Sequence, residues 1–274
     1  MIDRNHPVWG TAFEFLPERL ERFFLPFDII DLTRDDLQTI GAATPGSSSD
    51  AGSRGFTDDF IHDLEVIISG YPKGAHVRLG LCSFKKDTAL YPIKNAQGAL
   101  NMIMLPNRRV ASIVQYYVAS GIDASLFVFP WHNTPIWGEF RLFVYQASLV
   151  GVSQYRHGPI YEEIEQHCSE IVNVIQDFCE NFIDLLHLKN VVIDIFVDKK
   201  SDGNFTANII ELNPFIHRTD PCLFTWKNGG DFDRTFRFRK SIKNPYRDTT
   251  FQTVRQVDLG IFREIDYSAS ASIF

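Results

Sequence analysis

The sequence VVIDIFVDKKSDGNFTANIIELNPF, residues 191–215, predicts a β-hairpin. Its first seven residues are β-branched or apolar apart from one carboxylate, and residues 205–212 form a second apolar run. The charged segment between the two runs contains an Asp-Gly pair, which is typical of a tight turn. Because strands joined by a short turn pair antiparallel, we expect the rest of the chain to be organised around an antiparallel hairpin.

The hairpin carries three side chains that offer oxygen ligands. If Asp198 pairs with Ala207, the same register places Asp194 opposite Glu211. Glu211 and Asn213 are two residues apart, so both point to one face of their strand. Two carboxylates and an amide oxygen suit Mg²⁺, which usually needs a substrate phosphate to complete its shell. The alternative interpretation is a half-buried hairpin whose polar residues face solvent.

Length and composition indicate a folded protein. A chain of 274 residues can hold one large domain or two subdomains, and its apolar content is 45%. The formal net charge of −7 argues against broad electrostatic binding to nucleic acid or to anionic membranes. The first 20 residues carry five charges, and no apolar run approaches the roughly 20 residues of a membrane span. We therefore expect a cytoplasmic protein.

The cysteines show no pattern of metal ligation or disulfide pairing. They are four scattered residues without a CxxC pair, namely Cys82, Cys168, Cys179 and Cys222. Zinc ribbons and small disulfide-linked domains have regularly spaced cysteines. Cysteine spacing therefore indicates neither a zinc site nor a disulfide framework.

The remaining pattern predicts an α+β fold. Strands are expected at residues 27–32, 76–81, 99–105, 124–130, 137–145, 148–154 and 231–240, and helices at residues 16–24, 58–69, 110–117 and 159–188. Thr57 is available as N-cap of the second helix, and residues 44–56 are expected to form a flexible surface loop. Strands and helices do not alternate regularly, which favours antiparallel sheets covered by helices. No Walker or GxGxxG motif occurs, so a nucleotide would need another arrangement.

Two arginines in predicted strands are candidate phosphate ligands. Alternation along the strand puts Glu139 and Arg141 on the same face. They either form an ion pair across that face, or Arg141 points at a phosphoryl group, to which its planar, permanently charged fork is suited. Arg78 lies in the strand at residues 76–81 and is either a ligand or an exposed charge.

Four segments resemble the cell division cycle protein 123 family. They are W-x7-EFR at residues 131–141, LVGVSQ at 149–154, VIDIFVD at 192–198 and IELNPFIHRTDPCLFTW at 210–226. The order and spacing of these blocks also fit, and the strong similarity covers residues 125–226. Because members of this family adopt an ATP-grasp fold, the resemblance implies an ATP-grasp-like α+β fold with ATP bound between two sheet-containing subdomains.

The resemblance also implies a division of the chain and roles for its residues. Residues 1–124 would include the smaller nucleotide-binding subdomain, residues 125–226 would form the ATP-grasp core with the Mg-ATP hairpin, and residues 227–274 would pack on that core. Arg141 would be catalytic and contact the γ-phosphate, while Asp194, Glu211 and Asn213 would hold Mg²⁺. The nucleotide-binding residues would be Arg78, Phe127, Val128, Phe129, Glu139, Arg141 and Asn213, with adenine bonded by the backbone of residues 127–130. Arg78 stands where the family has a phosphate-binding lysine.

Two functions stay open on this resemblance. Eukaryotic members act as ATP-dependent assembly chaperones for translation initiation factor 2, binding its gamma subunit and promoting its joining to the alpha subunit. That is the function we expect. The alternative is an ATP-grasp ligase that activates a small carboxylate as an acyl phosphate, so it stays open whether the protein is an enzyme. Candidates for a basic acceptor pocket are Lys85, Lys86, Arg218 and the arginines of residues 234–239, which are otherwise solvated surface charges.

Overall fold

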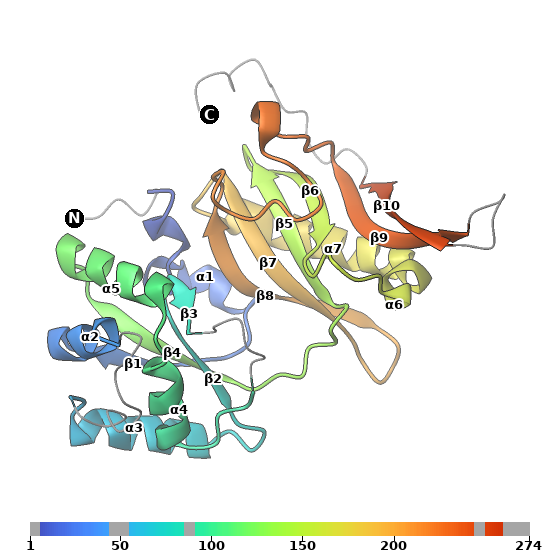
Figure 1. The fold of residues 1–274 in the computed structure, drawn as a ribbon. Coiled ribbons are helices and arrows are strands. Elements are labelled where there is room, and N and C mark those ends of the chain that lie inside the picture. Colours follow the sequence, from blue (N-terminus) through green and yellow to red (C-terminus); the bar gives the residue numbers. More distant parts are fainter. Residues whose placement is uncertain (1–5, 44–54, 85–90, 244–249, 260–274) are drawn as a thin grey trace. The chain divides into compact units, whose positions relative to one another are not determined.

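The computed structural model describes residues 6–43, 55–84, 91–243 and 250–259 (Figure 1). The chain forms two compact units. The hairpin unit comprises Met1–Thr11, Phe15–Phe24 and Thr134–Phe274, and the β4 unit comprises Ala12–Glu14 and Leu25–Asn133. Each unit combines a sheet with helices, which confirms the predicted α+β class. Among the described helices, none has the length and apolar character needed to span a bilayer.

The described strands of the hairpin unit form a six-stranded sheet in the order β10-β9-β6-β5-β7-β8. They are β5 (Glu139–Tyr145), β6 (Ser148–Gln154), β7 (Val191–Lys199), β8 (Phe205–Pro214), β9 (Thr235–Lys243) and β10 (Thr250–Asp258). Neighbouring strands are antiparallel except β6 and β9, which are parallel. The predicted hairpin is therefore confirmed as β7 and β8, and every residue of β7 up to Val197 is buried.

A β-bulge sets the register of the hairpin at the predicted site. At the turn end, Val197 and not Asp198 pairs with Ala207, so the predicted register is wrong there by one residue. The register shifts between Asp194 and Ile195, and beyond this bulge Asp194 pairs with Glu211 as predicted. An extra residue in one strand re-aims the side chains beside it, and such bulges are frequent next to functional sites.

Two helices cover the sheet of the hairpin unit where the sequence predicted a single one. They are α6 (Glu162–Gln166), which packs against β9, and α7 (Cys168–Phe182), which packs against β8 and continues as the 3₁₀ turn η4 (Ile183–Leu185). His167 separates them with φ −112° and ψ 23°, outside the helical region. Its ring lies 5.3 Å from that of Phe205, so a tertiary contact accompanies a break that the apolar stripe alone did not indicate.

The N-terminal segment joins the hairpin unit through a short backbone contact. It contains the 3₁₀ turn η1 (Trp9–Thr11) and the short helix α1 (Glu18–Glu21), which is less than the helix predicted at residues 16–24. Between them lies the 3₁₀ turn η2 (Phe13–Phe15), whose first two residues belong to the β4 unit. Phe24 then forms a parallel bridge with Ile209 of β8, whose backbone N–H donates to the Phe23 carbonyl at 2.8 Å. This contact explains why residues 15–24 belong to the hairpin unit.

The β4 unit has a four-stranded antiparallel sheet in the order β1-β4-β2-β3. Its strands are β1 (Asp28–Leu32), β2 (Ala75–Leu79), β3 (Cys82–Ser83) and β4 (Ala124–Pro130), and its helices are α2 (Arg34–Gly41), α3 (Asp58–Ser69), α4 (Ala96–Ile103) and α5 (Arg108–Ser120). Helix α2 packs against α5, and α3 packs against α4. The Thr57 hydroxyl accepts from the Phe60 backbone N–H at 3.2 Å, so the predicted N-cap of α3 is confirmed.

Two sequence expectations differ from the structure in this unit. The strand predicted at residues 99–105 is wrong, because Asn95 caps helix α4 there, accepting from the Gly98 N–H at 2.8 Å. The unit also extends to residue 133, beyond the expected boundary at residue 124. The physical reason is that β4 is hydrogen-bonded between β1 and β2 and cannot belong to the other sheet. The loop expected at residues 44–56 lies almost wholly outside the described residues.

One close approach in the hairpin unit gives a stability prediction. A Cβ at Gly151 of β6 would lie 2.7 Å from the Phe224 ring, which is buried and packs on Phe143 at 5.4 Å between centroids. Gly151→Ala is therefore expected to lower the free energy of unfolding by about 1–3 kcal/mol, since the ring has to shift. Gly158→Ala is the control, because its Cβ would meet nothing within 4 Å. Equal urea midpoints for the two variants would contradict the packing argument.

Candidate functional site

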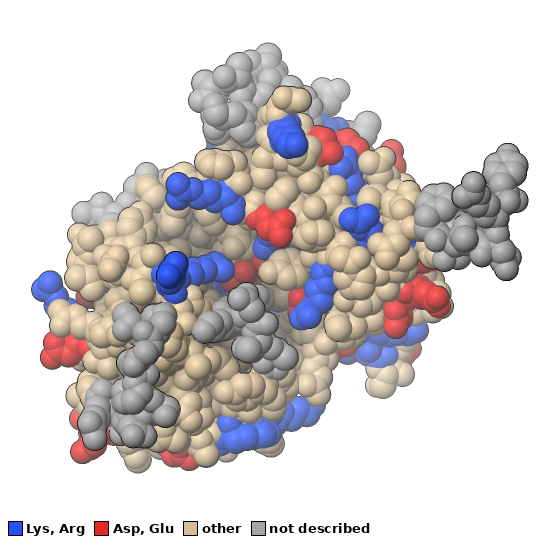
Figure 2. All heavy atoms as spheres, viewed as in Figure 1, with Lys and Arg blue, Asp and Glu red and all other residues tan. Residues whose placement is uncertain are grey.

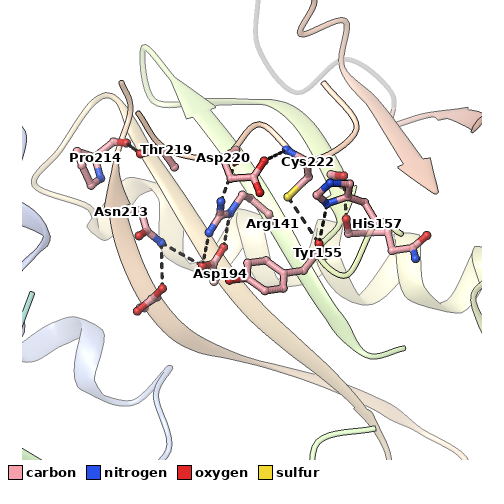
Figure 3. Close-up of polar contacts among 12 residues, drawn as sticks. Arg141, Tyr155, His157, Asp194, Asn213, Pro214, Thr219, Asp220 and Cys222 are labelled. Carbon is pink, nitrogen blue, oxygen red and sulfur yellow. Dashed lines mark hydrogen bonds and ion pairs between the residues drawn. The ribbon is translucent and has the colours of Figure 1, made fainter. Parts of the chain in front are cut away.

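The centre of the candidate site is a buried ion pair between Arg141 of β5 and Asp194 of β7 (Figure 3). Strand pairing puts the two residues directly opposite each other, and both are at most 5% exposed. The guanidinium contacts the carboxylate with two parallel bonds, from Nε to Oδ1 and from Nη2 to Oδ2, each 2.7 Å long. Such a bidentate pair is geometrically specific and fixes both side chains.

Glu211 and Asn213 of β8 lie on the other side of Asp194. Strand pairing places Glu211 beside Asp194, and both residues of β8 are half-buried. The Asn213 side-chain amide donates to Asp194 Oδ2 at 3.0 Å and reaches Glu211 Oε1 at 3.5 Å. The structure thus brings together four of the predicted site residues, Arg141, Asp194, Glu211 and Asn213, on one face of the sheet.

The pKa values at the site reflect burial and the Arg141–Asp194 ion pair, with a smaller effect of Glu211. Burial raises the pKa of Asp194 to about 6, with Arg141 acting in the opposite direction and the neighbouring Glu211 adding to the rise. Burial alone would lower the pKa of Arg141, but Asp194 outweighs it and raises that pKa above its ordinary value. The site therefore holds carboxylate charge that one arginine compensates only in part, which is the electrostatic condition for recruiting a cation.

Two groups that the sequence did not predict complete the surroundings of Arg141. Arg141 Nη1 donates to the backbone carbonyl of Asp220 at 2.7 Å. The guanidinium also lies over the ring of Tyr155, 4.9 Å from its centroid, in a cation–π contact. Burial raises the pKa of the Tyr155 hydroxyl, and Asp194 adds to the rise, so this ring stays neutral at physiological pH.

Glu139 does not contact Arg141 through the predicted ion pair. Its carboxylate pairs with Arg156, with Nη2 to Oε1 and Nε to Oε2 both 3.3 Å. Arg156 is half-exposed, and Asp194 is the carboxylate that takes the fork of Arg141. The alternative of a Glu139–Arg141 ion pair across the strand face is therefore wrong.

Arg78 lies in the β4 unit and is buried there, 4% exposed, so it is not the exposed charge considered as an alternative. Its guanidinium sits over the ring of Phe13, 4.5 Å from the centroid, and Nε donates to the Leu79 carbonyl at 3.2 Å. The nearby Glu14 carboxylate accepts from the Tyr117 hydroxyl at 3.0 Å, and burial raises the pKa of Glu14. Arg78 is thus held in a preorganised environment.

The strand that the resemblance assigns to adenine binding is β4, which lies between β1 and β2 in its sheet. Phe127 and Val128 pair with residues of β1 on one side and with residues of β2 on the other. Phe129 pairs only with His76 of β2, because the β1 ladder ends at Val128. Because Ala75 exchanges backbone bonds with Ile93 and the Trp131 N–H donates to the Gly74 carbonyl, alternation turns the backbone groups of Phe129 toward β2.

Two arginines of the candidate basic acceptor pocket are engaged in contacts within the protein. Arg237 is buried, contacts Asp231 at 2.7 Å and Asp233 at 2.9 Å, and lies 4.0 Å from the Phe224 ring centroid. Arg239 Nε donates to the His157 carbonyl at 3.0 Å. Arg218 is exposed, and Lys85 and Lys86 lie outside the described residues. Over the face in Figure 2, basic and acidic side chains are interspersed.

Comparison with known proteins identifies the family. The sequence profile of the D123 family matches residues 115–270, more than half of the chain. The chain is 27% identical over 155 residues to the translation initiation factor eIF2 assembly protein of Lodderomyces elongisporus, covering 54% of this chain and 36% of that protein. It is 37% identical over 94 residues to the protein of the same name from Xenopus laevis, covering 32% of this chain and 25% of that protein.

The fold also matches a solved structure. The structure of Cdc123 from Schizosaccharomyces pombe superposes with a TM-score of 0.66 and 17% sequence identity, covering 82% of this chain and 92% of the other. This match shows that the chain has the fold of Cdc123, an α+β fold as expected from the sequence. The aligned segments span only about a third or less of the two assembly proteins. The profile match and these relatives show that the chain belongs to the D123 family, the family of cell division cycle protein 123.

Proposed function

We propose that the protein binds Mg-ATP through the hairpin unit and acts in the cytoplasm as an ATP-dependent assembly factor for translation initiation factor eIF2. The observation that carries this proposal is the cluster of Asp194, Glu211, Asn213 and Arg141 on one sheet face. The hard oxygen donors of this cluster suit Mg²⁺, and Mg²⁺ is commonly bound by one or two carboxylates together with substrate phosphates.

The residues present fit a bound dication. Two neighbouring carboxylates share one bidentate arginine, so the site lacks positive charge, and Mg²⁺ would supply it. Asn213 now directs its amide nitrogen at both carboxylates, so it would offer its oxygen to the metal only after the amide turns. Asp194 and Glu211 are the ligands that need no such change. Bound Mg²⁺ would neutralise phosphate charge and orient the nucleotide.

Arg141 has two tasks in this proposal. It holds Asp194 in place and favours its ionised form, because its fork is bidentate on that carboxylate. The three observed bonds use three of its five N–H donors, which leaves N–H groups to contact the γ-phosphate. We further propose that Glu139 orients the segment after β6 through its ion pair with Arg156.

The family resemblance supports further proposals for nucleotide contacts. We propose that Arg78 contacts a phosphate, since its ring and carbonyl contacts hold the guanidinium in a defined orientation. The strand residues Phe127, Val128 and Phe129 would surround adenine, and backbone bonds to it would come from residues 127–130. These assignments follow the family resemblance.

The proposed partner follows from the names of the relatives. The proteins of Lodderomyces elongisporus and Xenopus laevis are named eIF2 assembly proteins, and the finer proposal is that this chain binds the gamma subunit. The test is co-purification of the full chain with recombinant eIF2 gamma, alone and with Mg-ATP. We expect retention that increases with Mg-ATP, and no retention under either condition would remove the partner from the proposal.

Nucleotide binding is predicted to depend on the metal. Titration of the wild-type chain with ATP in a calorimeter is expected to give at least tenfold tighter binding with Mg²⁺ than with EDTA, because the carboxylates repel metal-free ATP. Release of ADP is measured in the same samples, with and without a fraction of small metabolites. Equal affinity with and without Mg²⁺ would contradict the metal site, and metabolite-dependent turnover would make the protein a ligase.

A further inference from the structure

A second group of metal-ligating side chains lies beside the proposed magnesium site, and it belongs to different residues. It consists of His157, Asp220 and Cys222, and it offers one ring nitrogen, one carboxylate oxygen and one sulfur, all within 4.8 Å of one another. His157 follows β6, whereas Asp220 and Cys222 lie in the segment after β8. The fold therefore brings these three ligand types together from positions more than 60 residues apart.

The backbone that carries each of these side chains is fixed by contacts with other elements. Arg141 donates to the Asp220 carbonyl at 2.7 Å, and Arg239 donates to the His157 carbonyl at 3.0 Å. The Cys222 backbone N–H donates to Asp220 Oδ1 at 2.9 Å, which holds that carboxylate next to the thiol. The three ligand groups are thus carried on a rigid support, as a metal site requires.

The carbonyl of Tyr155 aligns the histidine with the cysteine. His157 Nδ1 lies 3.1 Å and Cys222 Sγ lies 3.8 Å from this oxygen (Figure 3). A carbonyl only accepts hydrogen bonds, so both side chains turn toward the same point. Cys222 also has a positive φ of 55°, and a left-handed backbone at a residue other than glycine is a strained conformation that concentrates at functional sites.

We propose that His157, Asp220 and Cys222 bind a transition-metal ion, with Zn²⁺ as the best match. Nitrogen, oxygen and sulfur donors together favour borderline ions such as Zn²⁺ over Mg²⁺, which takes oxygen ligands. Ligand atoms around a tetrahedral Zn²⁺ lie about 3.5 Å apart, so small side-chain rotations would complete the site. Asp220 is exposed while His157 and Cys222 are half-buried, which gives an ion a route to the site.

Three protein ligands leave the fourth position of the ion open to water or to another ligand. The ion would also be coupled to the proposed nucleotide site, because Asp220 is bonded to Arg141 through its backbone carbonyl. Metal binding itself needs no nucleotide, so its outcome does not depend on the proposed function. The cysteine spacing did not indicate this site because its ligands are one cysteine and two other residue types.

Cobalt is the probe for the test. The full-length wild-type chain, titrated with Co²⁺ after chelator treatment, is expected to show a thiolate-to-cobalt charge-transfer absorption that Zn²⁺ abolishes. Cys222→Ser removes the thiolate and with it the absorption. Cys168→Ser, at the other half-buried cysteine, is the matched control and keeps it. His157→Gln keeps the absorption and lowers the affinity at least tenfold.

Two results would overturn the proposal: a wild-type chain without the absorption, or a Cys222→Ser variant that retains it. Folding of each variant is checked by circular dichroism and thermal unfolding. If Cys222→Ser does not fold, Asp220→Asn decides the question, since an asparagine can still accept the bond from the Cys222 N–H while losing the charge. Unchanged Co²⁺ affinity in both Asp220→Asn and His157→Gln would then refute the site.

Discussion

Replacing Arg141 with alanine is expected to lower the free energy of unfolding by about 3–5 kcal/mol, because it leaves a buried carboxylate without its partner. Asp194 is 3% exposed and accepts two bonds from Arg141. Arg156→Ala is the matched control, since its ion pair with Glu139 has a 49% exposed arginine side chain. The control should cost at most about 1 kcal/mol. Urea unfolding followed by tryptophan fluorescence measures both variants.

Tryptophan fluorescence is suited to this measurement because the hairpin unit contains Trp9, Trp137 and Trp226 of the four tryptophans in the chain. A double variant, Arg141→Leu with Asp194→Leu, adds a second criterion. It removes both charges and should be less destabilised than Arg141→Ala, because no buried charge remains unpaired. Equal costs for Arg141→Ala and Arg156→Ala would show that burial of the first pair has no energetic consequence.

The metal-ligand part of the site could be predicted because it depends on local sequence. The turn between β7 and β8 is short, and a hairpin with alternating side chains places residues opposite each other from the sequence alone. The predicted pairing of Asp194 with Glu211 is confirmed, although the predicted pairing at the turn is wrong by one residue. The bulge between Asp194 and Ile195 shifts the register by that one residue. Pattern arguments do not indicate such a bulge.

The partners of Arg141 could not be predicted, because they come from other parts of the chain. The Asp220 carbonyl is 79 residues away, and its backbone position depends on the whole loop after β8. Tyr155 lies beyond the end of β6, where alternation no longer fixes the direction of a side chain. The sequence RTDPC at residues 218–222 did not indicate that Asp220 and Cys222 lie close to His157, since no motif relates His157 to either residue by a fixed spacing.

The misassigned elements have a similar cause. Residues 99–105 are mostly apolar, and a buried helix cannot be told from a strand by periodicity over so short a run. The cap at Asn95 was the available signal for helix α4. The boundary between the units could not follow from composition, because β4 is apolar enough for either sheet and only its pairing with β1 and β2 assigns it.

Glu211→Gln is expected to weaken Mg-ATP binding by at least tenfold, or about 1.4 kcal/mol, while the fold stays intact. The substitution keeps the size of a half-buried side chain and removes only its charge. Asp194→Ala is the less selective test, because it also leaves the buried Arg141 without a counter-ion, and lost binding would then be mixed with lost stability.

The matched control for Glu211→Gln lies in the same hairpin. Asp202→Asn changes the same charge in the turn between β7 and β8, where an asparagine is equally suited to the backbone. Because Asp202 lies in the exposed turn and outside the cluster around Arg141, the control should bind Mg-ATP as the wild type does. Calorimetric titrations with Mg²⁺ measure all three proteins. A folded Glu211→Gln variant with wild-type affinity would mean that Glu211 is not a magnesium ligand, and the raised pKa of Asp194 would then reflect burial, which outweighs the ion pair with Arg141, without a metal.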